Sequence, residues 1–123
     1  MKTFVIGGTG LVGSYLLPLL VENGHEVYAL TRSEYKIEKI NKLGAHGVFG
    51  DIRDPQSFRN NLPTDLDVIV LLAMPSVKPG QRMTSKRKEE LRKETNDFFR
   101  NSMDLANEYA IPIILPSGTS FNT

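Results

Sequence analysis

Short apolar runs alternate along this chain with longer stretches whose apolar positions recur every three or four residues. The short runs are typical of strands, and the recurring spacing is typical of helices. The predicted strands span Lys2–Ile6, Glu26–Leu30, Ala45–Phe49, Val68–Ala73 and Ile111–Leu115. The predicted helices span about Leu11–Asn23, Glu34–Leu43, Pro55–Asn60 and Lys86–Tyr109. This alternation predicts an α/β fold built on one parallel sheet.

Two of the runs are apolar throughout, which indicates strands that are buried on both faces. They are Phe4-Val5-Ile6 and the stretch from Val68 to Ala73, which is the most hydrophobic in the chain. We therefore expect three layers, with five parallel strands in the order 3-2-1-4-5 and helices on both faces of the sheet. In such a sheet a ligand binds beyond the carboxyl ends of the strands, where the strand order reverses. This places Ala73, Met74 and Pro75 in the expected binding crevice.

Glycine and proline predict how several of the helices begin and end. Gly24 and Gly44 follow the first two helices, where a left-handed residue commonly ends a helix. Pro18 lies inside the first helix, and we expect a slight bend there. Asp54 precedes Pro55, so its carboxylate is expected to cap the third helix.

A run of glycines joins the first strand to the first helix. It reads Gly7-Gly8-Thr9-Gly10-Leu11-Val12-Gly13. Glycine permits a tight turn, a close approach of backbone N–H groups to a diphosphate, and close packing of helix on strand. The helix N-terminus then favours the negative charge of the diphosphate. We interpret the whole run as a dinucleotide-binding loop, the alternative being a turn that binds nothing.

The end of the second strand predicts which dinucleotide binds. A fold that prefers NAD places an acidic residue there, about 20 residues after the glycines, to bind the ribose 2′-hydroxyl. This chain has Leu30, Thr31, Arg32 and Ser33 instead. A planar cation flanked by hydroxyls suits a 2′-phosphate, which predicts NADP rather than NAD. The alternative is that Arg32 is only an exposed surface arginine. Asp51, at the end of the third strand, is expected to face the adenine end of the cofactor.

Composition narrows the remaining classes of function. The 123 residues, with a net charge of +1, predict a single domain over residues 1–123 and no nucleic acid or membrane partner. The sequence has no cysteine and only two histidines, so we expect no disulfide and no metal site. No apolar run approaches the roughly 20 residues that span a bilayer. We expect a soluble, cytoplasmic protein, in which the basic run Lys86-Arg87-Lys88 is a solvated helix start.

With these stretches in place, the chain resembles the extended or atypical short-chain dehydrogenase/reductases, the group that contains the NAD(P)-dependent epimerases and dehydratases. The resemblance rests on GGTGLVG, GHEVYALTRS, GVFGDIRDPQSF, DVIVLLA, and Asn96 ahead of IILPSGTS. It implies a Rossmann fold and a nucleotide-binding oxidoreductase or epimerase. It also implies that the glycine loop holds the pyrophosphate, Arg32 the 2′-phosphate, Asp51 and Ile52 the adenine, and Ala73 and Met74 the nicotinamide-side ribose.

The catalytic residues of that family are the main departure. The family uses a Tyr-x-x-x-Lys pair after the fifth strand, and the sequence given ends before that point. Tyr35 and Lys39 have this spacing, but they follow the second strand, and we interpret the match as chance. The family's catalytic serine or threonine aligns with Gly118, which leaves Ser117 and Thr119 as weak catalytic candidates.

Three functions therefore stay open. The first is an NADP-dependent oxidoreductase or epimerase that transfers hydride to an unknown small-molecule substrate, with its substrate half absent from this chain. The second is a non-catalytic NADP(H)-binding sensor or regulatory module. The third is a small complete enzyme whose acceptor is docked by a partner. The apolar fifth strand would be a bare sheet edge, so we expect a homodimer or a missing C-terminal half to cover it.

Overall fold

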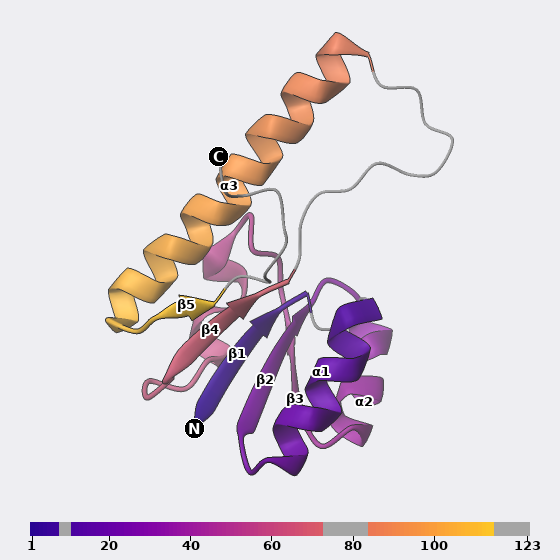
Figure 1. Cartoon of the computed structure of the whole chain (residues 1–123), viewed down its shortest axis with the longest axis vertical. Helices are drawn as coiled ribbons and strands as arrows, with labels where there is room; N and C mark the ends of the chain where they lie inside the picture. Colours follow the sequence, from indigo (N-terminus) through magenta and orange to yellow (C-terminus); the bar gives the residue numbers. More distant parts are fainter. Residues whose placement is uncertain (8–10, 73–83, 115–123) are drawn as a thin grey trace.

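The fold comes from a computed structural model that describes residues 1–7, 11–72 and 84–114, with residues 11–14 described by their backbone alone. Its five strands form one parallel sheet in the order β3-β2-β1-β4-β5. The strands are β1 (Lys2–Ile6), β2 (Glu26–Thr31), β3 (His46–Phe49), β4 (Val68–Leu71) and β5 (Ile113–Ile114). The predicted parallel sheet and its strand order are confirmed (Figure 1).

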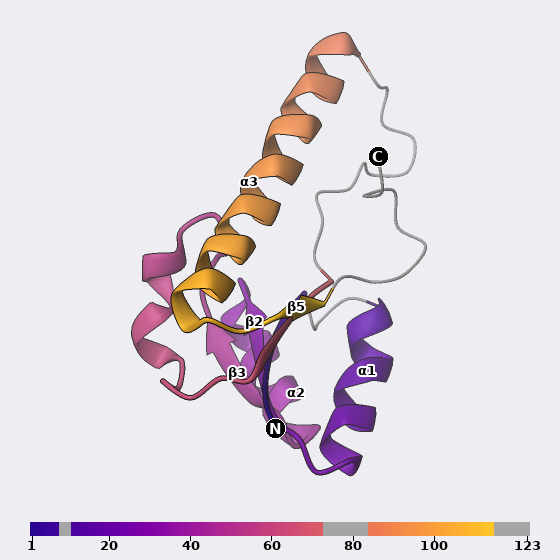
Figure 2. The ribbon, with the colours of Figure 1, turned by 60° about the vertical axis from the view of Figure 1, so that its left-hand side comes forward.

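Helices cover both faces of this sheet, as the continuous apolar strands predict. The helices are α1 (Leu11–Glu22), α2 (Glu34–Lys42) and α3 (Ser85–Tyr109), with short 3-10 turns at η1 (Pro55–Ser57) and η2 (Arg59–Asn61). Figure 2 shows α1 and α3 on opposite sides of the strands. The predicted three-layer α/β architecture is therefore present.

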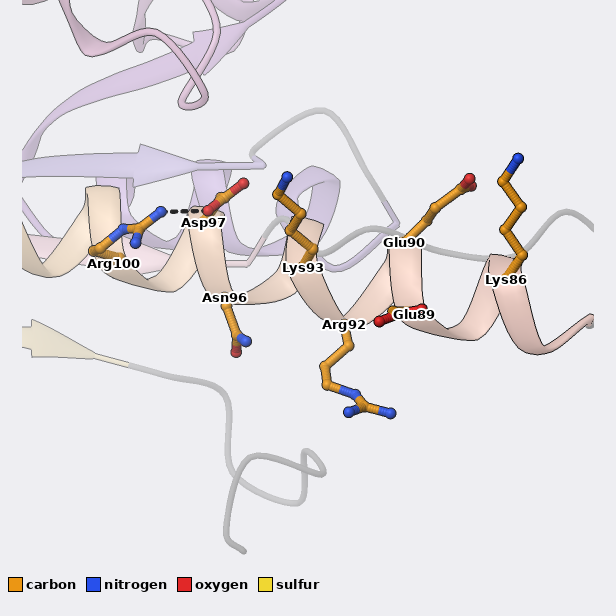
Figure 3. Close-up of a pocket in the computed structure, with 8 residues that line it drawn as sticks. All are labelled: Lys86, Glu89, Glu90, Arg92, Lys93, Asn96, Asp97 and Arg100. Carbon is orange, nitrogen blue, oxygen red and sulfur yellow. Dashed lines mark hydrogen bonds and ion pairs between the residues drawn. The ribbon is translucent and has the colours of Figure 1, made fainter.

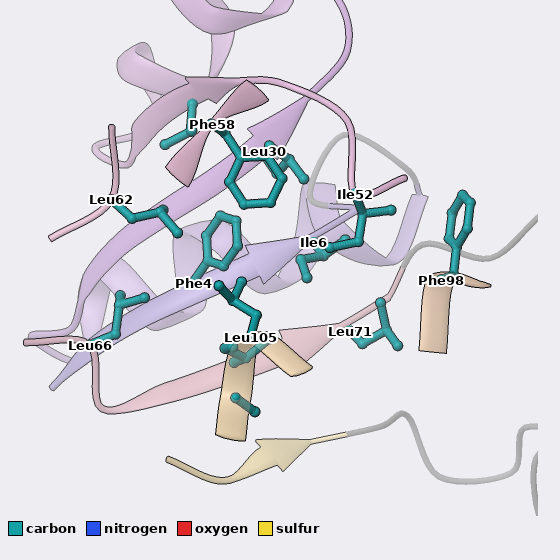
Figure 4. Close-up of a cluster of buried hydrophobic side chains, with 13 residues drawn as sticks. Phe4, Ile6, Leu30, Ile52, Phe58, Leu62, Leu66, Leu71, Phe98 and Leu105 are labelled. Atoms are coloured by element: carbon teal, nitrogen blue, oxygen red, sulfur yellow. The ribbon is translucent and has the colours of Figure 1, made fainter. Parts of the chain in front are cut away.

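Successive residues of the strands pack into two separate cores. Phe4 and Ile6 point to the α3 side and join a cluster that contains Phe58, Ile69 and Leu105 (Figure 4). Val5 points to the other side, where the cluster also contains Leu17, Val27, Ile40 and Val70. This alternation of side chains with a period of two is what a pleated strand imposes. Because each face meets a helical layer, both sets of side chains are removed from water.

The boundaries of α1 and α2 agree with the glycine rule. Gly24 and Gly44 both have positive φ, at 83° and 92°, and each follows its helix after one intervening residue. Their backbone N–H groups bond to the carbonyls of Val21 and Asn41, which would otherwise lack partners at the helix end. The left-handed stops predicted from sequence are thus confirmed.

The segment after β3 differs from the prediction. The expected helix over Pro55–Asn60 is two 3-10 turns, and the side chain of Asp54 makes no capping hydrogen bond. The Ser57 hydroxyl supplies the local bonds instead: it donates to the Asp54 carbonyl over 2.6 Å and accepts from the Asp51 N–H over 3.1 Å. The predicted aspartate cap is therefore wrong, and Ser57 ties the turn to the backbone of Asp51 and Asp54.

The fifth strand is shorter than predicted. Ile111 and Pro112 lie outside it, and Leu115 lies outside the described residues. The Ile111 N–H bonds back to the Ala106 carbonyl, which makes it part of the end of α3, and Pro112 has no N–H to give to a strand. Ile113 and Ile114 pair with Ile69 and Val70 of β4, and Ile114 is 52% exposed.

The start of α3 is solvated, as predicted for its basic run. Thr84 caps the helix by accepting from the Arg87 N–H over 3.1 Å. Lys86 and Lys88 are exposed, and Arg87 pairs with Glu90 and Glu94 of the same helix. The buried residues of α3 begin only at Phe98, because its first half stands beyond the sheet (Figure 1).

The end of α3 gives a test of backbone strain. Ala110 has φ 56° and ψ 45°, a left-handed conformation that glycine adopts more readily than alanine. We expect Ala110→Gly to raise the free energy of unfolding by about 0.5–1 kcal/mol, after allowance for the greater freedom of glycine in the unfolded chain. Chemical denaturation measures the change. Asn107→Gly, in the last turn of the same helix, is the control and should lower the free energy of unfolding. An Ala110→Gly protein less stable than wild type would contradict this view of the helix end.

Candidate functional site

The carboxyl ends of β1 and β4 lie side by side, which is the position where the strand order reverses. Ile6 pairs with Leu30 of β2 on one side and with Leu71 of β4 on the other, and the Leu72 N–H donates to the Ile6 carbonyl over 2.7 Å. Gly7 follows with φ 97°, so the expected positive φ of the turn is present here. Gly8, Thr9 and Gly10 lie outside the described residues, and Leu11, Val12 and Gly13 form the first turn of α1.

The end of β2 carries the predicted phosphate-binding residues. Arg32 is exposed there, directly after the strand. Thr31 is only 4% exposed, and its hydroxyl accepts from the Ser33 N–H over 3.1 Å. Thr31 therefore shapes the turn that presents Arg32. A direct contact of Thr31 or Ser33 with a ligand stays a prediction.

Asp51 and Arg32 lie at neighbouring strand ends. The Gly50 N–H donates to the Thr31 carbonyl over 2.9 Å, so the residues that follow Gly50 and Thr31 leave the sheet together. A Cβ on Gly50 would lie 2.7 Å from the Cβ of Phe58, a side chain with no exposed surface. Only glycine fits this close approach without a shift of the core. Gly50 thereby fixes where the chain turns toward Asp51.

The carboxylate of Asp51 is held by Arg53. Arg53 Nη2 donates to Asp51 Oδ2 over 2.7 Å, and the Arg53 backbone N–H donates to Oδ1 over 2.9 Å. These bonds to Arg53 are the main reason that the pKa of Asp51 lies below its usual range, and the positive charge of Arg32 acts in the same direction. Asp51 is therefore ionised at neutral pH.

A contact from α3 holds the loop that follows Asp51. The Asn101 side-chain amide donates to the Ile52 carbonyl over 2.9 Å, and Ile52 is buried in the core with Phe98. Sequence reasoning missed this contact, because 49 residues separate the partners. The one available signal was a polar residue next to the buried stripe of α3. Ile52, the other residue expected at the adenine, thus has a fixed backbone.

Several predicted residues lie outside the described part of the chain. They are Ala73, Met74 and Pro75, expected beyond β4, and the weak catalytic candidates Ser117 and Thr119. Tyr35 and Lys39, which have the Tyr-x-x-x-Lys spacing, lie on α2, and Tyr35 is 79% exposed. That helix connects β2 to β3 rather than following β5.

A hollow lies along α3, between Lys86 and Arg100 (Figure 3). Four basic and three acidic side chains line it together with Asn96, and Asp97 bonds to Arg100 within it. Figure 3 shows Arg92 and Asn96 on the side of the helix opposite to Glu90 and Lys93. These groups do not converge on one point, so the hollow has the character of a solvated helix surface.

Within residues 1–7, 11–72 and 84–114, no three side chains of histidine, cysteine, aspartate or glutamate are grouped in a way that could hold a metal ion. None of the helices in this part of the chain is long and apolar enough to cross a bilayer. The carboxyl ends of β1 to β4 remain the best-formed candidate site.

The Asp51–Arg53 bond predicts a pH dependence of stability. A carboxylate whose pKa is lowered by folding contributes stability above its unfolded pKa of about 3.9, and this is lost as pH falls through the lower folded value. We expect Asp51→Asn to lower the free energy of unfolding by at most about 1 kcal/mol at pH 7 and by progressively less below pH 4. Urea denaturation at several pH values measures this. Asp104→Asn, at an exposed position of α3, is the control; a deficit of Asp51→Asn that stays constant down to pH 2 would contradict the assignment.

Among curated proteins the chain is similar to oxidoreductases over part of its length. It is 39% identical over 62 residues to 4-hydroxy-2-methyl-3-oxo-4-farnesyl-3,4-dihydroquinoline-1-oxide ketoreductase of Stigmatella aurantiaca, covering 50% of this chain and 19% of that protein. It is 36% identical over 55 residues to the decarboxylating sterol-4-alpha-carboxylate 3-dehydrogenase of Dictyostelium discoideum, covering 45% of this chain and 17% of that protein. The matched segments are thus a small part of each relative.

Solved structures share the fold over nearly all of this chain. Yeast methylglyoxal/isovaleraldehyde reductase, in complex with NADPH, superposes with a TM-score of 0.74 at 19% identity, covering 94% of this chain and 36% of the reductase. UDP-glucose 4-epimerase from Bifidobacterium longum, in complex with NAD+ and UDP, superposes with a TM-score of 0.74 at 17% identity, covering 95% of this chain and 37% of the epimerase. The chain therefore spans about a third of these structures, and at this identity the likeness shows the fold.

The family follows from the sequence match itself. The model of the NAD dependent epimerase/dehydratase family matches residues 3–98, from β1 into α3. This range contains the glycine loop, Arg32, and the Asp51 loop. Together with the Rossmann-like sheet, the match establishes that this chain belongs to the NAD-dependent epimerase/dehydratase family of the short-chain dehydrogenase/reductases.

Proposed function

We propose that this chain is the nucleotide-binding part of an NADP-dependent oxidoreductase or epimerase that acts on a small-molecule substrate by hydride transfer. The single observation that carries the proposal is the position of Arg32. It is exposed at the end of β2, beside the end of β3, and its positive charge helps to lower the pKa of Asp51. Of the two dinucleotides, only NADP offers a dianionic group for such a cation.

The described residues fit a dinucleotide in three places. Gly7, with φ 97°, begins the turn between β1 and α1, and the N-terminus of α1 suits the pyrophosphate. Arg32 would bind the 2′-phosphate. Asp51 would accept a hydrogen bond from the adenine amino group, beside the fixed backbone of Ile52. When bound, the cofactor supplies the hydride, and these residues hold its adenosine and phosphate groups.

The nicotinamide end would lie beyond the neighbouring ends of β1 and β4. Ile6 pairs with Leu71 at these strand ends, and Ala73, Met74 and Pro75 follow β4 in sequence. We therefore assign these three residues to the nicotinamide side. A ligand at the reversal of strand order is the general rule for open α/β sheets. The substrate itself would contact residues outside the third or so of the solved structures that this chain covers.

The preference for NADP over NAD has a physical basis in the same residues. Binding of NAD is favoured by a carboxylate at the end of the second strand, which accepts from the ribose 2′-hydroxyl. In this chain the nearest carboxylate from the neighbouring strand, Asp51, already accepts from Arg53. Arg32 would meet the uncharged ribose of NAD without an anionic partner. Arg32 and the already bonded Asp51 together therefore favour binding of a ribose that carries a 2′-phosphate.

Arg32→Ala tests the proposal. We expect the affinity for NADP to fall about tenfold to a hundredfold, because one charge-assisted contact is lost, while the affinity for NAD changes little. Titration calorimetry with both dinucleotides measures the two affinities. Arg59→Ala is the matched control, since it removes another arginine, one that bonds to Glu108 near the carboxyl end of α3. Equal affinity of the wild-type chain for NADP and NAD, or an unchanged preference in Arg32→Ala, would contradict the proposal.

A further inference from the structure

The bond between Arg53 and Asp51 occupies the group that an adenine would need. Arg53 Nε lies 3.2 Å from Oδ1 and 3.1 Å from Oδ2 of Asp51, Nη2 lies 2.7 Å from Oδ2, and the Arg53 backbone N–H lies 2.9 Å from Oδ1. A carboxylate offers about four acceptor positions. Three N–H groups make these four contacts, because the Nε–H is shared between the two oxygens, so most of these positions are used. An adenine amino group at Asp51 would therefore compete with Arg53 for the carboxylate.

The side chain of Arg53 is placed so that it can move. It is 52% exposed, whereas that of Asp51 is 27% exposed, so water can replace the bonds that the guanidinium would lose. The Arg53 backbone N–H holds Oδ1 from the turn itself, whose backbone is fixed by the bond from Asn101 to Ile52. Release of the guanidinium would therefore leave the Asp51 carboxylate in place.

Arg32 and Arg53 are the two cations that lower the pKa of Asp51. Arg32 leaves the end of β2, one residue after Thr31, whose carbonyl accepts from the Gly50 N–H. Arg53 follows Asp51 by two residues in the adjacent loop. Glu94 of α3 also acts on Arg53, so its guanidinium has carboxylates on more than one side. A phosphate dianion bound by Arg32 would attract the second guanidinium as well.

We propose that Arg53 is a specificity-determining residue that couples two parts of the nucleotide site: its guanidinium holds Asp51 until a 2′-phosphate draws it away, which frees Asp51 for the adenine amino group. This inference rests on the proposed function, because it assumes an NADP site. It adds a second arginine to that site and a reason why the base and the phosphate would be recognised together. With NAD, which has no 2′-phosphate, Arg53 would stay bonded to Asp51, and the site would discriminate poorly between adenine and other bases.

The coupling is measured with four ligands: NADP, NAD, and the analogue of each in which hypoxanthine replaces adenine. Hypoxanthine has a carbonyl where adenine has an amino group, so it cannot donate to Asp51 at that position. In the wild-type chain we expect a preference for adenine of about tenfold or more in the NADP pair and close to none in the NAD pair. In Arg53→Ala we expect the same adenine preference in both pairs, because Asp51 is always free.

The variants of Arg53 also change the choice of cofactor. Arg53→Ala should lower the preference for NADP over NAD about tenfold or more, through weaker NADP binding and tighter NAD binding. Arg53→Lys keeps the charge but loses the planar fork, and should give an intermediate preference. Arg59→Ala, which frees a different carboxylate, should leave all four affinities as in wild type.

The possible failures are distinguishable. If the wild-type chain binds none of the four ligands, the proposed function is overturned and this inference with it. If NADP binds but the adenine preference is equal in the two pairs of the wild type, the coupling is overturned alone. If the coupling is present and persists in Arg53→Ala, Arg53 does not carry it. Only a coupling that is present in the wild type and absent from Arg53→Ala supports the inference.

Discussion

The pairing of β1 with a parallel strand on each side is the constraint on which the rest of the fold depends. Phe4 and Ile6 reach the core under α3, while Val5 reaches the core under α1 and α2. A shift of one residue in this strand would exchange the two faces and place every side chain in the wrong core. The same register brings Ile6 beside Leu30 and Leu71, so the carboxyl ends of β2, β1 and β4 lie next to one another. The candidate site is a consequence of that register.

Under the proposed function, nucleotide recognition at this edge would be divided between backbone and side chains. The turn at Gly7 and the start of α1 offer N–H groups, which suit any dinucleotide of this family. In the proposed function, the charged side chains at the ends of β2 and β3 would distinguish one nucleotide from another. Among them Asp51 is held by Arg53 and influenced by Arg32, so no one of the three acts alone. Nucleotide preference would therefore be a property of the cluster.

Sequence rules correctly predicted the features that depend on single residues or on short patterns. Gly24 and Gly44 end their helices with positive φ, as sequence predicts, because this conformation is a property of single residues. The strand order followed from the apolar runs and their alternation with helices. The side chain of Asp54 makes no cap, and the local side-chain bonds come from Ser57 instead. Ala110 adopts a left-handed conformation that no pattern predicts for alanine. The bond from Asn101 to Ile52 joins distant residues, whereas the Asp51–Arg53 pair was close enough to be predicted from its spacing.

Hydrogen exchange of backbone amides, with and without NADP, tests most directly that the nucleotide binds across the carboxyl ends of the strands. We expect NADP to slow exchange in Leu30–Ser33, Gly50–Arg53 and the end of β4. The amino-end turns, Asn23–His25 and Thr64–Asp67, should exchange at the same rate in both states. Protection confined to those amino-end turns or to the first half of α3, with none at the ends of β2 and β3, would contradict the account.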